Sequence, residues 1–150
     1  MGEYVEGTRE LTEKLRELAS PKEQAATLRA AVSEPMRDVM RVARLNIARI
    51  SPGKRQIHRT YRGRLVTAGF AARNLRMITR MSRDKQMAQS VLGVRKEAFY
   101  ALQFFELGTA KIPRQPWLTP AFYQSRDRML AKVGEAMRKR IERIARKRGR

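Results

Sequence analysis

The sequence predicts an α+β fold, in which long amphipathic helices accompany a small, mostly antiparallel sheet and a long basic helix ends the chain. Two observations lead to this prediction. Apolar residues recur at steps of three and four over most of the chain, and two short apolar segments flank a polar turn. With 150 residues, of which 42% are hydrophobic, the chain is long enough to bury the core of one domain.

The first fifty residues predict two helices. Leu11, Leu15 and Leu18 mark a short amphipathic helix that begins near Thr8. A second helix starts at Ser20-Pro21-Lys22-Glu23, where serine is the cap, proline fits the first helical position and Glu23 can bind the Ser20 amide. Its apolar stripe runs for about 30 residues to Ser51-Pro52, and consists of Leu28, Val32, Met36, Val39, Ala43, Ile47 and Ile50.

Pro35 lies inside this stripe. Because proline lacks an amide donor, it predicts either a kink or a restart of the helix with Ser33 as the new cap. After the helix, residues 51–64 are polar and basic, which predicts a long exposed loop. Leu65–Ala72 is open to either a short helix or an irregular strand.

The middle of the chain predicts a β-hairpin. Leu75–Met81 and Met87–Val94 are the strand candidates, and Ser82–Lys85 forms the turn between them. Gly93 indicates a bulge or a close backbone approach within the second strand.

Two more helices are expected towards the C-terminus. Ala98–Leu107 predicts a short buried helix closed by Gly108, and a proline-rich loop pinned by Trp117 follows it. The last helix begins at Thr119-Pro120. Its expected core stripe is Phe122, Leu130, Val133, Met137, Ile141 and Ile144.

The positive charge is concentrated in the second part of the chain. The 34 Lys and Arg against 14 Asp and Glu give a net charge of +20, yet residues 1–50 hold 9 basic and 8 acidic side chains. The excess of basic residues lies in residues 51–150, and their density is highest near the C-terminus. This distribution indicates a scaffold with one basic face and an anionic or acidic partner.

The composition and the lack of known motifs argue against several classes of function. The chain has no cysteine, which excludes disulfides and thiolate metal sites. His58 is the single histidine, so the usual zinc sites with two or three histidines are excluded, and a solvent-exposed histidine is the favoured interpretation. With no paired carboxylates, phosphate loop or nucleophile motif visible, we expect no enzyme, no cofactor and no metal. No membrane span or signal peptide is visible either.

The segment from Phe104 to Phe122 is the most distinctive stretch. Glu106 stands inside an apolar run, where a carboxylate needs either a cluster of backbone amides or an arginine as its partner. The order Phe105-Glu-Leu-Gly-Thr109 and then Gln115-Pro-Trp-Leu-Thr-Pro-Ala121 resembles the neck or tail-completion family of long-tailed bacteriophages, the minor tail protein Z-like head–tail joining proteins. The resemblance covers about residues 5–125 and leaves the basic C-terminus outside it.

The resemblance implies a fold, an assembly and a set of partners. We expect a tail-completion-like α+β domain over residues 1–125, with 126–150 as a basic helical extension of the same domain. The family implies a non-enzymatic virion protein, made in the host cytoplasm, that forms a homo-oligomeric ring, expected to be a hexamer. This ring joins the head connector or head-completion protein to the tail terminator or tail tube. The expected interface comprises Phe105, Glu106, Gly108, Thr109, Pro116, Trp117 and Pro120.

The basic C-terminus supports an alternative function. It is either a solvated helix face or a contact surface for DNA or an acidic partner. In the second case the chain is a small nucleic-acid-binding protein without sequence preference, because the segment shows no recognition-helix or finger motif and no aromatic residue for base stacking. The candidate contact residues are Arg138, Lys139, Arg140, Arg143, Arg146, Lys147 and Arg148.

Overall fold

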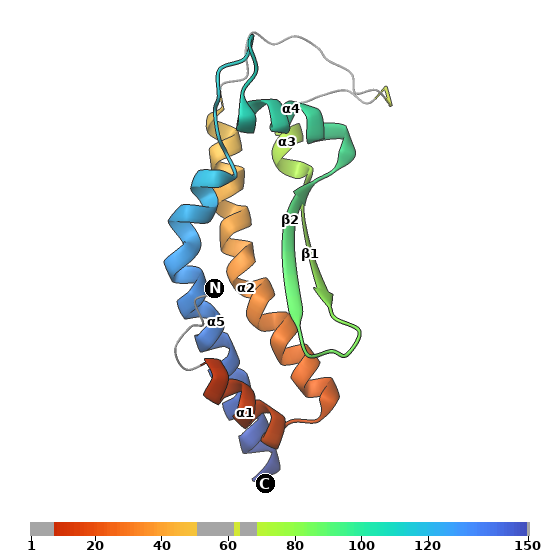
Figure 1. The fold of residues 1–150 in the computed structure, drawn as a ribbon, viewed down its shortest axis with the longest axis vertical. Coiled ribbons are helices and arrows are strands. Elements are labelled where there is room, and N and C mark those ends of the chain that lie inside the picture. The colour runs from red at the N-terminus through yellow and green to blue at the C-terminus, as the bar shows by residue number, and fades with distance from the viewer. Residues whose placement is uncertain (1–7, 51–61, 64–68, 150) are drawn as a thin grey trace. The chain divides into compact units, whose positions relative to one another are not determined.

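The part of the chain that the structure describes is mostly helical, with one two-stranded antiparallel sheet, which confirms the α+β prediction. The structure, a computed structural model, describes residues 8–50, 62–63 and 69–149. Most of the predicted loop at 51–64, including His58, and residues 65–68 lie outside the described residues. The described elements are, in chain order (Figure 1), α1 Thr8–Leu18, α2 Pro21–Arg49, α3 Phe70–Arg73, β1 Leu75–Met81, β2 Ala88–Val94, α4 Lys96–Leu107 and α5 Thr119–Arg148.

These elements form two compact units, each assembled from segments that are distant in sequence. Unit 1 consists of Met1–Asp38, Thr79–Val91 and Arg126–Arg150, and unit 2 consists of Val39–Ile78 and Leu92–Ser125. The long helices α2 and α5 and both strands continue from one unit into the other. The expected domain over 1–125 with its extension over 126–150 stays a prediction.

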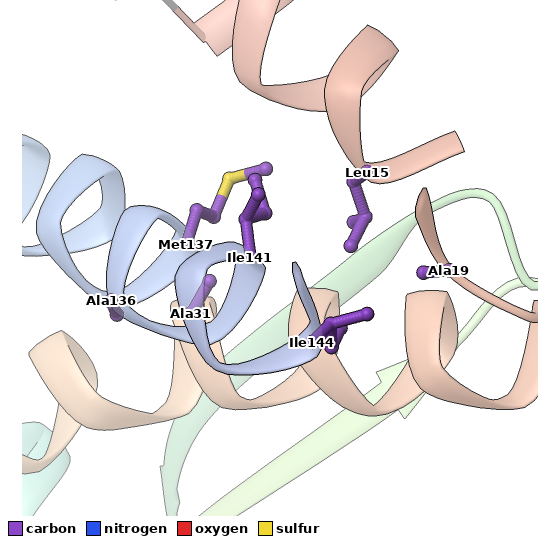
Figure 2. Close-up of a cluster of buried hydrophobic side chains, with 7 residues drawn as sticks. All are labelled: Leu15, Ala19, Ala31, Ala136, Met137, Ile141 and Ile144. Carbon is purple, nitrogen blue, oxygen red and sulfur yellow. The ribbon is translucent and has the colours of Figure 1, made fainter. Parts of the chain in front are cut away.

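The core of unit 1 joins the two ends of the chain. Figure 2 shows its buried side chains, which come from α1 and the residue after it, from α2 and from the C-terminal part of α5. They are Leu15, Ala19, Ala31, Ala136, Met137, Ile141 and Ile144. Leu11, Leu18, Leu28 and Val133 pack against this cluster. The C-terminal helix therefore contributes core residues as well as charge.

The start of α2 has the predicted cap. The Ser20 amide donates to Glu23 Oε2 at 2.9 Å, and the Ser20 hydroxyl donates to the same oxygen at 2.7 Å. The Glu23 amide lies 3.4 Å from Ser20 Oγ, so serine and glutamate satisfy each other's backbone donors. These hydrogen bonds hold the pKa of Glu23 below its usual value.

The predicted restart at Pro35 is wrong, because α2 is one continuous helix of 29 residues with Pro35 inside it. Ser33 is no cap, since its hydroxyl donates to the Ala30 carbonyl within the helix. Pro35 is almost completely buried, and this burial offsets the hydrogen bond that its missing amide removes. The buried positions of α2 follow steps of four, at Thr27, Ala31, Pro35, Val39, Ala43 and Ile47.

The hairpin is confirmed, with β2 beginning one residue later than expected. The Ser82 amide donates to the Met87 carbonyl at one end of the hairpin, and the Arg95 amide donates to the Asn74 carbonyl at the other. Both pairs fit one register, so no bulge occurs between them. A Cβ atom added at Gly93 would meet nothing within 4 Å. The predicted bulge or close approach at Gly93 is therefore wrong.

Unit 2 departs from the expected core at two places. The helix α4 ends at Gly108 as predicted, but it buries only Ala98 and Leu102 and leaves several aromatic side chains exposed. Phe122, expected in the core stripe of the last helix, is 42% exposed, whereas its neighbour Ala121 is fully buried. Amphipathic spacing alone favoured the larger side chain, and the packing selects the smaller one.

Candidate functional site

The candidate site is the loop between α4 and α5 in unit 2, where the motif residues gather. Gly108 closes α4, as predicted, and has a positive φ of 77°. A Cβ atom at this position would lie 3.2 Å from both the backbone nitrogen and the Cβ of Arg114. Glycine is therefore required both by the backbone angle and by the close passage of the returning chain.

The base of the loop is closed by two hydrogen bonds to backbone carbonyls of α4. The Gln115 amide donates to the Phe105 carbonyl at 2.8 Å, and Arg114 Nε donates to the Glu106 carbonyl at 3.1 Å. At the tip, the Thr109 hydroxyl accepts from the amides of Lys111 and Ile112, which forms a tight side-chain-stabilised turn. The loop is thus an ordered hairpin-like segment without strands.

The carboxylate of Glu106 binds the backbone that begins α5. Its Oε2 accepts hydrogen bonds from the amides of Trp117 and Leu118, both at 2.8 Å. Its Oε1 accepts from the Thr119 amide at 3.0 Å and the Thr119 hydroxyl at 2.5 Å. The first amides of a helix lack partners inside the helix, and the helix dipole there favours a negative charge. Of the two partners that the sequence left open for Glu106, the structure has the amide cluster.

This environment also sets the charge state of Glu106. Partial burial on its own raises the pKa of the carboxyl group, but the hydrogen bonds from Thr119, Leu118 and Trp117 outweigh it. The pKa of Glu106 is therefore held below its usual value. Glu97, the other carboxylate of α4, has a separate partner, because it faces Arg62 at 4.0 Å.

Trp117 connects three helices. Its indole Nε1 donates to the Leu102 carbonyl of α4 at 2.9 Å, and its own carbonyl accepts from Asn46 Nδ2 of α2 at 3.0 Å. With its amide bound to Glu106, both backbone groups and the indole nitrogen of this residue have partners. Trp117 is 3% exposed, so it supports the loop from inside.

Next to the loop, α4 presents a second apolar face to the outside. Phe99, Tyr100, Phe104 and Leu107 are 45%, 61%, 41% and 66% exposed, respectively. The Phe99 and Tyr100 rings meet edge to face with centroids 5.7 Å apart, and the Tyr100 and Phe104 rings are 6.5 Å apart. Positions 99, 100, 104 and 107 share one side of an α-helix, so these side chains form one stripe, the α4 aromatic face. Single exposed apolar residues are ordinary, but a stripe of four is typical of a contact surface.

The expected interface residues fall into two groups. Thr109 and Pro116 are exposed, whereas Phe105, Glu106, Gly108 and Pro120 are half-buried and Trp117 is buried. The motif therefore builds and holds the loop more than it supplies the outer surface. The sequence interpretation missed the α4 aromatic face, although the apolar residues on several sides of this helix are its signal. It also missed Asn46, which no local pattern connects with Trp117.

The basic candidates of α5 lie at different positions around the helix. Lys139, Arg143 and Arg146 are on its outer face, whereas Arg140 is half-buried. Arg148 Nη2 lies 3.8 Å from Glu23 Oε2, and Lys139 Nζ lies 2.5 Å from Glu135 Oε1. The seven residues named from the sequence therefore do not form one surface.

The described part of the chain holds neither a metal-binding cluster nor a membrane-spanning helix. No group of three or more His, Cys, Asp or Glu residues able to hold a metal ion occurs among residues 8–50, 62–63 and 69–149. In the same ranges, no helix is long and apolar enough to cross a membrane. Comparison of the chain with protein families, with curated proteins and with solved structures finds no match. The resemblance to the phage neck family therefore depends on features of the sequence alone.

Proposed function

We propose that this chain is a structural subunit of the neck of a long-tailed bacteriophage, where copies of it form a ring between the head connector and the tail. The ring, a hexamer by the family resemblance, leaves a channel for DNA. The subunit acts without catalysis, and its partners are further copies of itself, the head-completion or connector protein, and the tail terminator or tail tube. It is located in the virion after synthesis in the host cytoplasm.

The α4 aromatic face is the observation that carries this proposal. Four exposed apolar side chains on one side of a 12-residue helix favour association, because their burial against a partner removes apolar surface from water. Aromatic residues are also the type that dominates binding energy at protein interfaces. A second copy of the chain is the occupant that we propose, since a ring needs two different contact surfaces on every subunit.

The Glu106 loop supports the same proposal. The loop is fixed at its base and tip by hydrogen bonds within unit 2, so it loses little conformational freedom when a neighbour binds. Its exposed residues Thr109 and Pro116 lie in the segment between α4 and α5. A rigid loop beside an apolar helix face is suited to a permanent structural contact.

The assembly is tested by sedimentation velocity of the purified chain over a range of concentrations, at low and high salt. We expect a discrete species several times heavier than the 17.4 kDa subunit. The double substitution Tyr100→Ser with Phe104→Ser should shift this species to the monomer without a loss of helix content, because both side chains are exposed in the subunit.

The matched control is Leu45→Ser with Met87→Ser, which removes two apolar side chains that are 56% and 70% exposed elsewhere. This variant should assemble like the wild type. A wild-type chain that is a monomer at every concentration and in both salts would overturn the ring. The position in the virion is tested by the reading frames beside the gene, which should encode head-completion and tail-terminator proteins.

A further inference from the structure

The outer surface of α5 in unit 1 is chemically unlike the α4 aromatic face. Between residues 126 and 148, every exposed residue is charged except Ala131 and Ala145. The basic residues among them are Arg126, Arg128, Lys132, Arg138, Lys139, Arg143, Arg146, Lys147 and Arg148, and the acidic ones are Asp127, Glu135 and Glu142. This surface has no exposed aromatic or large aliphatic side chain of the kind that anchors a protein partner.

Five of these basic residues share one side of the helix: Arg128, Lys132, Lys139, Arg143 and Arg146. Because successive residues turn by about 100°, these positions lie within an arc of about 60°. This basic stripe is opposite the side that carries Met137, Ile141 and Ile144 into the core of unit 1. It extends over about 27 Å, which is most of one turn of B-DNA.

Within the part of the chain that the structure describes, three arginines of the basic stripe have no ion-pair partner. Lys132 is paired with Asp38, and Lys139 with Glu135. Arg128, Arg143 and Arg146 form no ion pair with any residue in the described ranges. Arg143 and Arg146 lie about one helical turn apart, so their guanidinium groups repel each other, and a polyanion that also reaches Arg128 meets three positive charges along the helix.

We propose that the basic stripe binds the phosphate backbone of double-stranded DNA without sequence preference. Guanidinium groups match phosphate geometry through paired hydrogen bonds, and a duplex offers phosphates along the whole length of the stripe. The lack of exposed apolar side chains disfavours an acidic protein, and the lack of aromatic residues after Tyr123 disfavours single strands, whose bases stack on such rings. This inference goes beyond the proposed assembly role and does not depend on it.

The test measures the affinity of the full chain for a labelled DNA duplex of random sequence between about 50 and 200 mM salt. Five phosphate contacts give a slope of about −4.5 for log affinity against log salt concentration. The variant Arg128→Gln, Arg143→Gln, Arg146→Gln should reduce this slope to about −2. The matched control, Arg76→Gln, Arg80→Gln, Arg83→Gln, removes the same charge from exposed positions of the hairpin and should keep most of the slope.

Equal loss in both variants would overturn the proposal, because binding would then follow the net charge of the chain alone. Polyglutamate or single-stranded DNA that competes as well as the duplex at equal charge would also overturn it. Sedimentation of the same samples distinguishes this result from the assembly role. The stripe variant should form the same oligomer as the wild type, so loss of DNA binding and loss of the ring are separate observations.

Discussion

One carboxylate, that of Glu106, joins the end of α4 to the start of α5. It accepts hydrogen bonds from three backbone amides and one hydroxyl. Glu106→Gln keeps the shape of the side chain but replaces one carboxylate oxygen with an NH2 group. The hydrogens of this group then face the backbone N–H groups that the oxygen accepts from in the wild type. We expect the free energy of unfolding at neutral pH to fall by about 2 kcal/mol. Urea denaturation measures this, with Glu142→Gln on the exposed face of α5 as a control that should change it little.

The effect of Glu106→Gln should depend on pH. The pKa of Glu106 is lower in the folded chain than in the unfolded chain, so the folded state binds protons less readily. Its contribution to stability is therefore fully present above the unfolded pKa of about 4.3 and is lost as the pH falls through the folded pKa. The difference between wild type and variant should disappear below that range. A difference that is the same at neutral and strongly acidic pH would contradict a role for the charge.

At the scale of the element, α5 contains one position that weakens a 30-residue helix. Gly134 lies in the middle of α5, and a Cβ atom added there meets nothing within 4 Å. Because glycine has more conformational freedom in the unfolded chain than alanine, Gly134→Ala should raise the free energy of unfolding by about 1 kcal/mol. Thermal denaturation followed by circular dichroism measures the change. The same substitution at Gly108, where φ is positive and Arg114 lies close, should destabilise the chain.

Elements whose signals are local were predicted well from the sequence. The cap of α2 involves Ser20 and Glu23, and the hairpin turn lies within Ser82–Lys85. The glycine end of α4 depends on Gly108 alone. Each of these structures is decided by residues a few positions apart, so composition and spacing contain the necessary information.

Faces that depend on distant partners were predicted less well. In α2 the sequence favoured Leu28, Val32 and Met36, whereas the buried positions lie one residue earlier and hold smaller side chains. Phe122 and the aromatic residues of α4 were expected inside for the same reason, their hydrophobicity. Helix packing at close distance selects small residues, and only the tertiary structure shows where it occurs.

Part of the candidate site could be predicted from the sequence. The cost of leaving a carboxylate in an apolar segment required a partner for Glu106. The choice between amides and an arginine depended on the path of the loop, which returns eleven residues later at Trp117. The contact of Asn46 with the Trp117 carbonyl spans 71 positions and has no sequence signal.

At the scale of the whole molecule, two units share continuous elements. The helices α2 and α5 each supply residues to both units, so the unfolding of either unit shortens helices of the other. Trp117 is the single tryptophan and is buried in unit 2, whereas the helices report on both units. We expect tryptophan fluorescence and far-ultraviolet circular dichroism to give the same urea midpoint. Two separate midpoints would show that the units unfold independently.

The loop between α4 and α5 also offers a place to modify the chain. Its base is fixed by Glu106 and by the bond from Gln115 to Phe105, while Ala110 and Lys111 at its tip are exposed. Inserted sequence is tolerated where the ends of a loop are held by contacts outside the insertion. A short epitope or a dye-labelling tag between Ala110 and Lys111 would thus mark the protein while its helices keep their cap, and would make the segment visible to an antibody or a fluorophore.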